Sequence, residues 1–424
     1  MQHTVRAAVA ATLLAFTASA FAQADNAILE RARAEKQPLL ETLKTLTAIE
    51  SGSRDLEGLA KIGNVVAERL HALGATVEMV EPADVYRMED TPPQVAKAVR
   101  ATFKGKGQKK LLMIAHMDTV YLKGMGEKQP FRVDGDKAYG LGIADDKQGI
   151  ALILHALKIV KDTGFDEYGT ITVLVNPDEE ISTPGHRALI TRLGSENDAV
   201  MSFEGGGSDK DQVRLATAGI AGVTIKVKGK ASHAGSAPER GINAMVELAN
   251  QILQTKDLSD PATGLKMNWT MAEAGNGSHN VIPEHAQAFA DVRVTKLDDY
   301  DRIEREVRDR ITHKIVPNAQ VEMVFERRRP PLQTWEASTK VAEHAQEIYK
   351  EVGRSLIVDA KAEGGGTDAA FAALKTRNAV IERFGLQGFG AHSTEDEYIL
   401  VSSIEPRLYL ATRLIMDVSQ GKVL

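Results

Sequence analysis

The sequence predicts an α/β protein with a mainly parallel central sheet, plus an inserted segment of α+β type. Over residues 27–215, short apolar runs alternate with patterns typical of amphipathic helices, which is the order of a parallel sheet covered by helices. Over residues 219–327 the strands instead alternate apolar and polar positions, as half-exposed strands do. After residue 327 the alternation of helices and buried strands returns, so we expect one discontinuous unit interrupted by a second.

The first unit begins with helix and strand patterns in regular succession. Its first helix is followed by Gly74, a residue typical of the position just after a helix. Two later runs are continuously apolar and too short for helices, which indicates buried strands. The expected elements are a helix over 62–73, strands over 76–80, 111–115 and 171–175, and a helix over 150–160.

The insert shows the order strand, helix, strand, strand, helix, strand, which is typical of a ferredoxin-like α+β fold. Its second helix is rich in charge, so most of that helix should face solvent. The expected elements are strands over 223–227, 268–272, 286–294 and 320–325, and helices over 244–253 and 300–315. A further helix is expected near 341–352, after the insert.

Length and charge limit the classes of protein that this chain can be. It has 424 residues with 43% hydrophobic content, enough for two or three domains of about 100–200 residues each. The net charge is −6, with acids and bases interspersed, which argues against nucleic acid as a partner. There is no cysteine, so disulfides and thiolate metal sites are excluded. Any metal ligands must be histidines and carboxylates.

The N-terminal residues 1–22 are typical of a secretory signal peptide. Arg6 precedes an apolar stretch over 7–18, which leads to the small-residue cleavage pattern Ala20-Phe21-Ala22. A membrane anchor is the alternative, but the stretch falls short of the ~20 apolar residues that span a bilayer. We expect an exported protein, periplasmic or secreted, that has no contact with the membrane after cleavage before Gln23.

Acid and imidazole residues follow several of the predicted strands. His116 and Asp118 come directly after the strand 111–115, and positions two apart in extended chain point to the same side. Asp118 can therefore fix the ring of His116, as carboxylates often do for metal-bound histidines. Asp145 lies in a glycine-rich turn before the helix 150–160, where it could supply one oxygen to each of two metals. On its own, an acid there is also an ordinary helix cap.

Three further pieces complete the set. Glu179 and Glu180 follow the strand 171–175, Glu204 ends the apolar run 199–203, and His392 lies in a late glycine-rich loop. Neighbouring carboxylates point in different directions, so one can bind metal while the other moves a proton. Each motif alone could be an ordinary acidic loop, but the set predicts a two-metal hydrolase.

In this order the motifs resemble the M20 family of metallopeptidases, and most closely its glutamate carboxypeptidase branch. The resemblance covers nearly all of the chain beyond the leader. It implies a zinc-exopeptidase-like catalytic domain formed by residues 23–218 and 328–424. It also implies that residues 219–327 are a lid or dimerisation domain, in a protein that is a homodimer.

The resemblance also implies the roles of the acids and imidazoles. One zinc ion would bind His116, Asp145 and Glu204, and the other Asp145, Glu180 and His392, giving two Zn²⁺ per subunit, for which Co or Mn could substitute. Glu179 would be the general base and then the general acid. Asp118 would orient His116. The family has a cis peptide after its bridging aspartate, so one is expected between Asp145 and Asp146.

Substrate contacts follow from the same resemblance. His233, in the insert, would reach the active site of the partner subunit and stabilise an oxyanion, whereas its residues alone favour a turn histidine. Asn280 and Arg293 match further substrate-binding positions. Arg329 would grip the substrate carboxylate through two parallel N–H bonds, the geometry that guanidinium offers. Without the resemblance, the run 327–329 reads as a solvated basic cluster.

The expected reaction is hydrolysis of the amide bond to a C-terminal amino acid, glutamate above all, in a small peptide or N-acyl amino acid with a free carboxylate. Another M20 amide hydrolase, such as an N-acyl amino acid deacylase, a desuccinylase or a dipeptidase, remains an alternative. An M28-type aminopeptidase has similar ligands but no insert. An exported, non-catalytic ligand-binding protein would not need a base such as Glu179.

Overall fold

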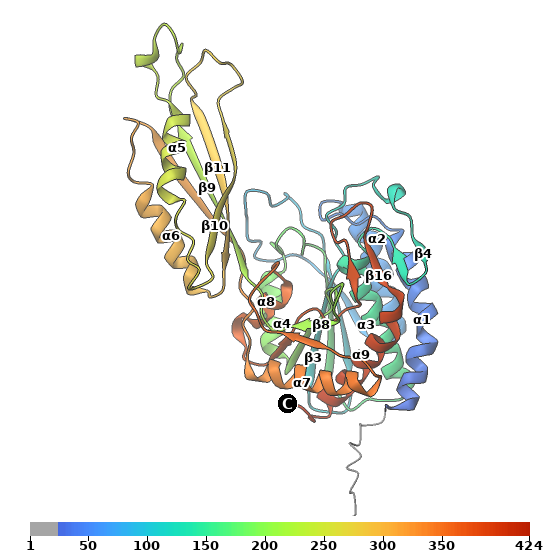
Figure 1. Ribbon diagram of the computed structural model, residues 1–424. Coiled ribbons are helices and arrows are strands. Elements are labelled where there is room, and N and C mark those ends of the chain that lie inside the picture. Colours follow the sequence, from blue (N-terminus) through green and yellow to red (C-terminus); the bar gives the residue numbers. More distant parts are fainter. Residues whose placement is uncertain (1–23) are drawn as a thin grey trace, which may run out of the picture.

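The structure is a computed structural model that describes residues 24–424, so the predicted signal peptide lies outside the described residues. Figure 1 shows a larger α/β body and a smaller, elongated body that projects from it. The α/β class with a mainly parallel central sheet is confirmed. Within residues 24–424, no helix has both the length and the apolar character needed to cross a membrane.

The central sheet has six strands, and its middle is parallel. Strands β6, β3, β7 and β14 run parallel to one another, whereas β1 and β2 are antiparallel additions at one edge. In order across the sheet the strands are β1 (Thr76–Val80), β2 (Ala98–Lys104), β6 (Thr170–Asn176), β3 (Lys110–His116), β7 (Ala199–Ser202) and β14 (Ala379–Ile381).

Helices cover both faces of this sheet, which explains the continuous apolar run in β3. Leu111 and Met113 pack in the core on the side of α1, α3 and α9, whereas Leu112 and Ile114 pack on the side of α4 and α8. The helices of the larger body are α1 (Asn26–Thr47), α2 (Leu56–Ala72), α3 (Gln148–Asp162), α4 (Arg187–Glu196), α7 (Glu336–Glu351), α8 (Asp368–Ala372) and α9 (Ile404–Ser419).

The smaller body is an antiparallel sheet with two helices and a core of its own. Its strand order is β10 (Lys266–Ala274), β11 (His285–Val294), β9 (Gly219–Lys228) and β12 (Gln320–Arg329). The helices are α5 (Ala244–Thr255) and α6 (Asp298–Arg310). Along the chain these elements follow the predicted order of strand, helix, strand, strand, helix, strand.

The expected end of the second insert helix at residue 315 is wrong, because α6 ends at Arg310. Beyond the helix, the chain is bound by the carboxylate of Glu247 on α5. Its Oε2 accepts hydrogen bonds from the backbone N–H groups of Ile315 and Val316 at 2.9 and 2.7 Å. This contact between distant residues takes the place of further helical bonds.

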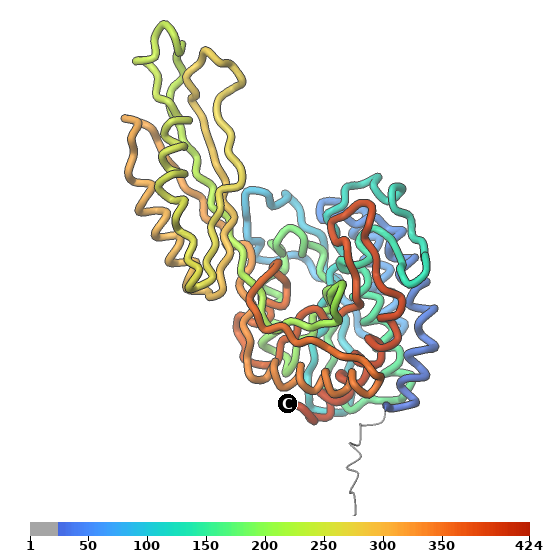
Figure 2. The backbone as a smooth tube through the Cα atoms, viewed as in Figure 1, coloured from blue at the N-terminus to red at the C-terminus, as the bar shows by residue number. Residues whose placement is uncertain are grey.

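Two small sheets complete the larger body, and the sequence analysis did not foresee them. One has the order β15 (Gly388–Phe389), β16 (Tyr398–Leu400), β5 (Lys137–Tyr139) and β4 (Arg132–Asp134), and the other pairs β13 (Ile357–Asp359) with β8 (Gln212–Arg214). The β15–β16 hairpin carries His392. In Figure 2 this red hairpin lies beside the blue-green segment that contains β4 and β5.

The two bodies are joined by two adjacent chain segments and by polar contacts. At the junction the backbone N–H of Thr217 donates to the carbonyl of Leu332 at 3.1 Å. Arg328, near the end of β12, forms a bidentate ion pair with Asp90 at 2.9 and 3.1 Å. Polar interfaces of this kind are typical of domains that can move relative to one another.

Candidate metal centre

The predicted metal-binding side chains gather at one edge of the central sheet. Strands β3, β6 and β7 are parallel, so their carboxyl ends meet at the same edge, where open α/β sheets place their sites. His116 ends β3, Glu179 and Glu180 lie in the loop after β6, and Glu204 lies just beyond β7.

A glycine-rich loop brings Asp145 to the same edge. Gly142 has a left-handed backbone with φ of 70°, a conformation that glycine adopts at little cost. The peptide bond between Asp145 and Asp146 is cis, as expected. The buried carboxylate of Glu397 accepts hydrogen bonds from the backbone N–H groups of Gly142 and Ala144, both at 2.8 Å. The β15–β16 hairpin thus holds the loop that carries Asp145.

The carboxylate of Asp145 lies between two imidazoles. Its Oδ1 is 2.9 Å from Nε2 of His116, and its Oδ2 is 3.4 Å from Nε2 of His392. Each imidazole also has a glutamate of its own: His116 is 3.6 Å from Oε1 of Glu204, and His392 is 3.3 Å from Oε2 of Glu180. This is the arrangement of a carboxylate that can offer one oxygen to each of two ions.

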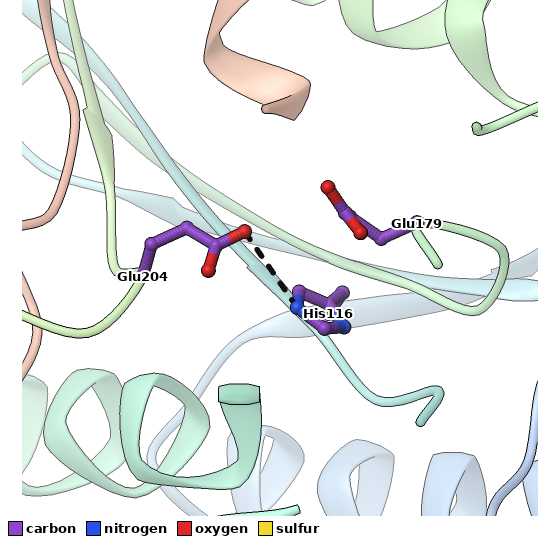
Figure 3. A group of neighbouring side chains, drawn as sticks. All are labelled: His116, Glu179 and Glu204. Atoms are coloured by element: carbon purple, nitrogen blue, oxygen red, sulfur yellow. Dashed lines mark ion pairs between the residues drawn. The ribbon is translucent and has the colours of Figure 1, made fainter. Parts of the chain in front are cut away.

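Potential ligand atoms converge in two groups. The atoms of His116, Glu179 and Glu204 lie within 4.8 Å of one another, and so do those of Asp145, Glu180 and His392. Figure 3 shows the first group, with Glu204 and Glu179 reaching from different loops toward the ring of His116. The geometry therefore places Glu179 as near to this centre as the residues expected to bind metal.

One buried oxygen is consistent with a bound cation. Oε1 of Glu180 is buried and has no hydrogen-bond partner in the described part of the chain, which is rare for a buried oxygen. The donor set is imidazole nitrogen and carboxylate oxygen, and this combination suits zinc. A divalent cation would satisfy this oxygen.

The electrostatics of the centre also favour a bound cation. Burial raises the pKa of Glu204 well above its usual range, and the neighbouring Asp145 raises it further. Burial also raises the pKa of Glu180, against the hydrogen bond with His392. Burial would raise the pKa of Asp145 too, but its hydrogen bonds with His116 and His392 outweigh burial and bring the pKa below its usual value. Crowded, buried acids of this kind are stabilised by a nearby positive charge.

Asp118 contacts both His116 and the loop of paired glutamates. Nδ1 of His116 lies 3.1 Å from the Asp118 carbonyl and 3.4 Å from its Oδ1. The Asp118 carboxylate also accepts the backbone N–H groups of Glu179 and Glu180, both at 3.0 Å, and the hydroxyl of Ser53 at 2.7 Å. The sequence suggested only the contact with His116, because the others join segments that are far apart along the chain.

Arg329 is engaged with other residues of the protein. Its side chain is 5% exposed, and its Nη2 lies 2.8 Å from Oε1 of Glu179. Its Nη1 lies 3.2 Å from Oδ1 of Asp368, which also accepts a hydrogen bond from Asn176 through its Oδ2 at 2.7 Å. Arg329 lines the cavity at the centre, and it fixes the carboxylate that the sequence analysis expects to be the base.

Of the three predicted substrate residues in the insert, one lies at this cavity. Arg293 lines it and is paired with Asp291 at 2.9 and 3.1 Å. His233 and Asn280 are exposed and lie close together, in segments beyond the end of β9 that is remote from the junction. Neither lines this cavity.

The fold and the site define a metal-dependent hydrolase. The chain belongs to peptidase family M20/M25/M40, whose model matches residues 112–417. It is 44% identical over 422 residues to carboxypeptidase G2 from Pseudomonas sp. (strain RS-16), covering 100% of this chain and 99% of that protein. It is 26% identical over 327 residues to the succinyl-diaminopimelate desuccinylase of Gluconobacter oxydans (strain 621H), covering 72% of this chain and 81% of that one.

Solved structures agree on the fold. The M20 family metallo-carboxypeptidase Sso-CP2 from Sulfolobus solfataricus superposes with a TM-score of 0.71 at 17% identity, covering 90% of this chain and 98% of that one. The aminopeptidase PepT from Bacillus cereus ATCC 10987 gives a TM-score of 0.72 at 21% identity, covering 90% and 98%. The recognition made from the motifs is confirmed, and the M28-type alternative falls.

Proposed function

We propose that this protein is a dinuclear-zinc carboxypeptidase that releases a C-terminal glutamate from a small peptide or N-acyl amino acid. The observation that carries the proposal is the carboxylate of Asp145 between the imidazoles of His116 and His392. It occurs in a chain that is 44% identical over its whole length to carboxypeptidase G2. The enzyme class follows from the family, and the glutamate preference is inferred from this relative.

Two ions would be held by the residues that converge at the sheet edge. We assign His116, Asp145 and Glu204 to one ion, and Asp145, Glu180 and His392 to the other. When bound, such a pair acts as a Lewis acid toward a carbonyl oxygen and lowers the pKa of water. Zinc is the preferred ion because the donors are nitrogen and oxygen, and Co or Mn would serve as substitutes.

Glu179 is the proposed proton carrier. Its carboxylate belongs to the group around His116 and forms an ion pair with Arg329, which fixes its position close to the centre. It would take a proton from the attacking water and hand the proton to the leaving amine, the usual task of a positioned carboxylate. Asp118 would orient His116 and keep the loop with Glu179 in place.

The substrate would be held by residues of both bodies. Arg329 and Arg293, which line the cavity, are the proposed partners of the substrate carboxylate. His233 would stabilise the oxyanion, as hydrogen-bond donors do in acyl transfer, with Asn280 beside it. Because these two residues lie at the far end of their own lid, we assign them to the active site of the other subunit.

This assignment requires a particular assembly. Residues 219–327 would be a lid and dimerisation domain, and residues 23–218 and 328–424 the catalytic domain, in a homodimer. The protein would be exported through its signal peptide, to the periplasm or the medium. These proposals rest on the family resemblance and on the N-terminal pattern of the sequence.

A hydrolysis screen tests the proposed reaction. N-acyl derivatives of glutamate, aspartate and neutral amino acids are compared, with and without a chelator, and with Glu179→Ala as the inactive control. Release of glutamate that the chelator abolishes supports the proposal. Turnover confined to other M20 substrates, such as N-succinyl amines or dipeptides with a free amine, would reassign the protein to a deacylase, a desuccinylase or a dipeptidase.

A further inference from the structure

Four guanidinium groups line the cavity at the metal centre, and two of them lack a full set of partners. The cavity has a volume of about 550 Å³ and contains Asp145, Glu180, Glu204 and His392 in its wall. Arg293 and Arg329 lie in the same wall but are paired with carboxylates of the protein. The two that remain are Arg214 and Arg383.

Arg383 carries an unpaired positive charge. It is half-buried, follows β14 and has a left-handed backbone with φ of 62°, an uncommon conformation for any residue other than glycine. Its carbonyl accepts a hydrogen bond from Arg407 at 3.4 Å. Between residues 24 and 424, its guanidinium has no carboxylate within 4.0 Å and donates no hydrogen bond. A half-buried charge without a partner points to a ligand of opposite charge.

The neighbouring acid does not neutralise Arg383. Glu382 is buried, and its Oε2 has no hydrogen-bond partner in the described part of the chain. Within the described residues it forms no ion pair with Arg383 or with Arg214 at 4.0 Å or less. Burial raises the pKa of Glu382 above its usual value, against the charge of Arg383.

Arg214 lies on the next segment of chain. Its backbone N–H donates to the carbonyl of Glu382 at 2.8 Å, and its carbonyl accepts the N–H of Glu382 at 2.9 Å, so Arg214 lies opposite the residue that precedes Arg383. Its Nε is 3.2 Å from Oδ2 of Asp359, and its Nη1 donates to the carbonyl of Glu363 at 3.1 Å. Its Nη2 donates no hydrogen bond in the described part of the chain. Burial and the charge of Arg383 lower the pKa of Arg214.

A glycine loop joins this pair to Arg329. A Cβ on Gly364 would lie 2.5 Å from Nη1 of Arg214, and a Cβ on Gly366 would lie 2.2 Å from Cδ of Arg329. The loop therefore runs against both side chains, and only a residue without a Cβ allows such close approach. A substrate carboxylate at Arg329 and a second one near Arg214 would lie along the same wall.

We infer that Arg383 and Arg214 form a subsite for a second carboxylate of the substrate, which we assign to the side chain of its C-terminal residue. The inference rests on the proposed carboxypeptidase function and names the residues that make it selective for acidic residues. Two guanidinium groups in the wall of one cavity can bind the oxygens of a carboxylate and would be stabilised by its charge. A neutral side chain would leave the charge of Arg383 uncompensated, whereas Arg214 would keep its ion pair with Asp359.

Matched substrates that differ in one charge test this subsite. N-Benzoyl-glutamate and N-benzoyl-glutamine have nearly the same shape, so the ratio of their kcat/KM values reports the side-chain carboxylate. We expect the wild-type ratio to exceed ~10, since a site built for a polar group rejects analogues that lack it. Arg383→Gln and Arg214→Gln should each lower that ratio at least tenfold, and Arg383→Lys should lower it less.

The control is Arg33→Gln on α1, an exposed arginine in a surface ion pair with Glu30, which should leave the ratio unchanged. Circular dichroism and bound metal verify that each variant is folded. If the variants fail to fold, inhibition of the wild-type enzyme by free glutamate and free glutamine gives the same comparison, with glutamate expected to bind at least tenfold more tightly.

Three outcomes would overturn the inference. A wild-type ratio near one would do so while leaving the carboxypeptidase function intact, and so would a ratio that Arg383→Gln does not change. The third outcome concerns substrates whose second carboxylate lies on the acyl group rather than on the C-terminal side chain. If N-succinyl-glutamine is preferred over N-benzoyl-glutamine and Arg383→Gln removes that preference, the subsite belongs to the acyl side. A protein that hydrolyses neither N-benzoyl-glutamate nor N-benzoyl-glutamine refutes the proposed function itself, and the inference with it.

Discussion

Nη2 of Arg329 lies 2.8 Å from Oε1 of Glu179, which joins the last residue of a strand of the smaller body to the proposed base of the larger one. Burial of both groups makes this contact strong, because a charge removed from water depends on its partner. The position of the base is therefore tied to the junction between the two bodies, and the consequences can be measured.

Glu179→Gln should abolish turnover while the protein keeps its metal. The substitution preserves shape but removes the group that accepts and returns the proton, a contribution of about 10²–10⁴-fold to the rate. Steady-state kinetics give kcat, and elemental analysis gives metal per subunit. The matched control is Glu196→Gln on α4, an exposed acid paired with Arg192. A kcat within a few-fold of wild type would remove Glu179 from the reaction.

Arg329→Met should lower kcat/KM by at least tenfold, because the buried carboxylates of Glu179 and Asp368 lose their common partner. Breaking a buried ion pair costs about 3–5 kcal/mol, so the free energy of unfolding should fall as well. Chemical denaturation and kinetics are measured on the same samples. Unchanged stability would mean that the pair contributes nothing in solution.

Asp145→Asn should release metal and abolish activity. An amide offers one acceptor oxygen where the carboxylate offers two, so His116 and His392 could no longer share it. Elemental analysis and titration with zinc check this. Asp166→Asn, a substitution of a half-buried acid paired with Lys106, is the control. Wild-type metal content in Asp145→Asn would contradict the bridging role.

Asp118→Asn should weaken metal binding or activity by about 10–100-fold, the usual cost of losing a carboxylate that orients a ligand. One oxygen of Asp118 accepts the N–H of Glu179, and the other accepts the N–H of Glu180 and the hydroxyl of Ser53. An amide can replace only one of these acceptors. Zinc affinity and kcat are the readouts, and rescue by Asp118→Glu would point to charge rather than shape.

The stability of the protein should depend on pH through His155. Burial lowers the pKa of this histidine despite the contact of its Nδ1 with Glu35 at 2.6 Å. The unfolded chain therefore takes up the proton first, at its ordinary pKa of about 6.5. The stability that neutral His155 contributes is present above that pH and is lost as the pH falls below it. Denaturation of wild type and His155→Gln at pH 7.5 and 5.5 checks this.

The difference in unfolding free energy between these two proteins should shrink toward pH 5.5. Comparing the pair removes the effect of other titrating groups, since both proteins share them. His71→Gln, a substitution of an exposed histidine near the end of α2, is the control and should follow wild type at both pH values. A difference that grows on acidification would show that the ion pair with Glu35 dominates.

Elements buried on both faces could be predicted from the sequence with good bounds. The run 111–115 is continuously apolar because β3 has helices over each face, and its pattern reflects this directly. The end of α6 could not be predicted, because Glu247 binds the chain beyond it from another helix. The short strands of the two small sheets carry too few residues for a pattern.

The candidate site also contains residues that could be predicted from the sequence and contacts that could not. His116 and the glutamates could be proposed because each follows a recognisable strand, and parallel strands end at one edge. Other features of the site depend on contacts between residues that are distant in the chain. These are the hydrogen bonds of Glu397 to the loop with Asp145, the ion pair of Arg329 with Glu179, and the placement of Arg214 and Arg383 in one cavity. Nothing in the local sequence marks those contacts.

The β15–β16 hairpin supplies His392 and Glu397 only after nearly the whole polypeptide has been synthesised. A nascent chain therefore contains His116, Glu179 and Glu180 long before His392 is available to complete the metal centre. Ion capture should be a late event in maturation, coupled to docking of the C-terminal residues. Proteolytic loss of those residues would remove an imidazole, the support of Asp145 and the buried side chains of α9 in a single cut.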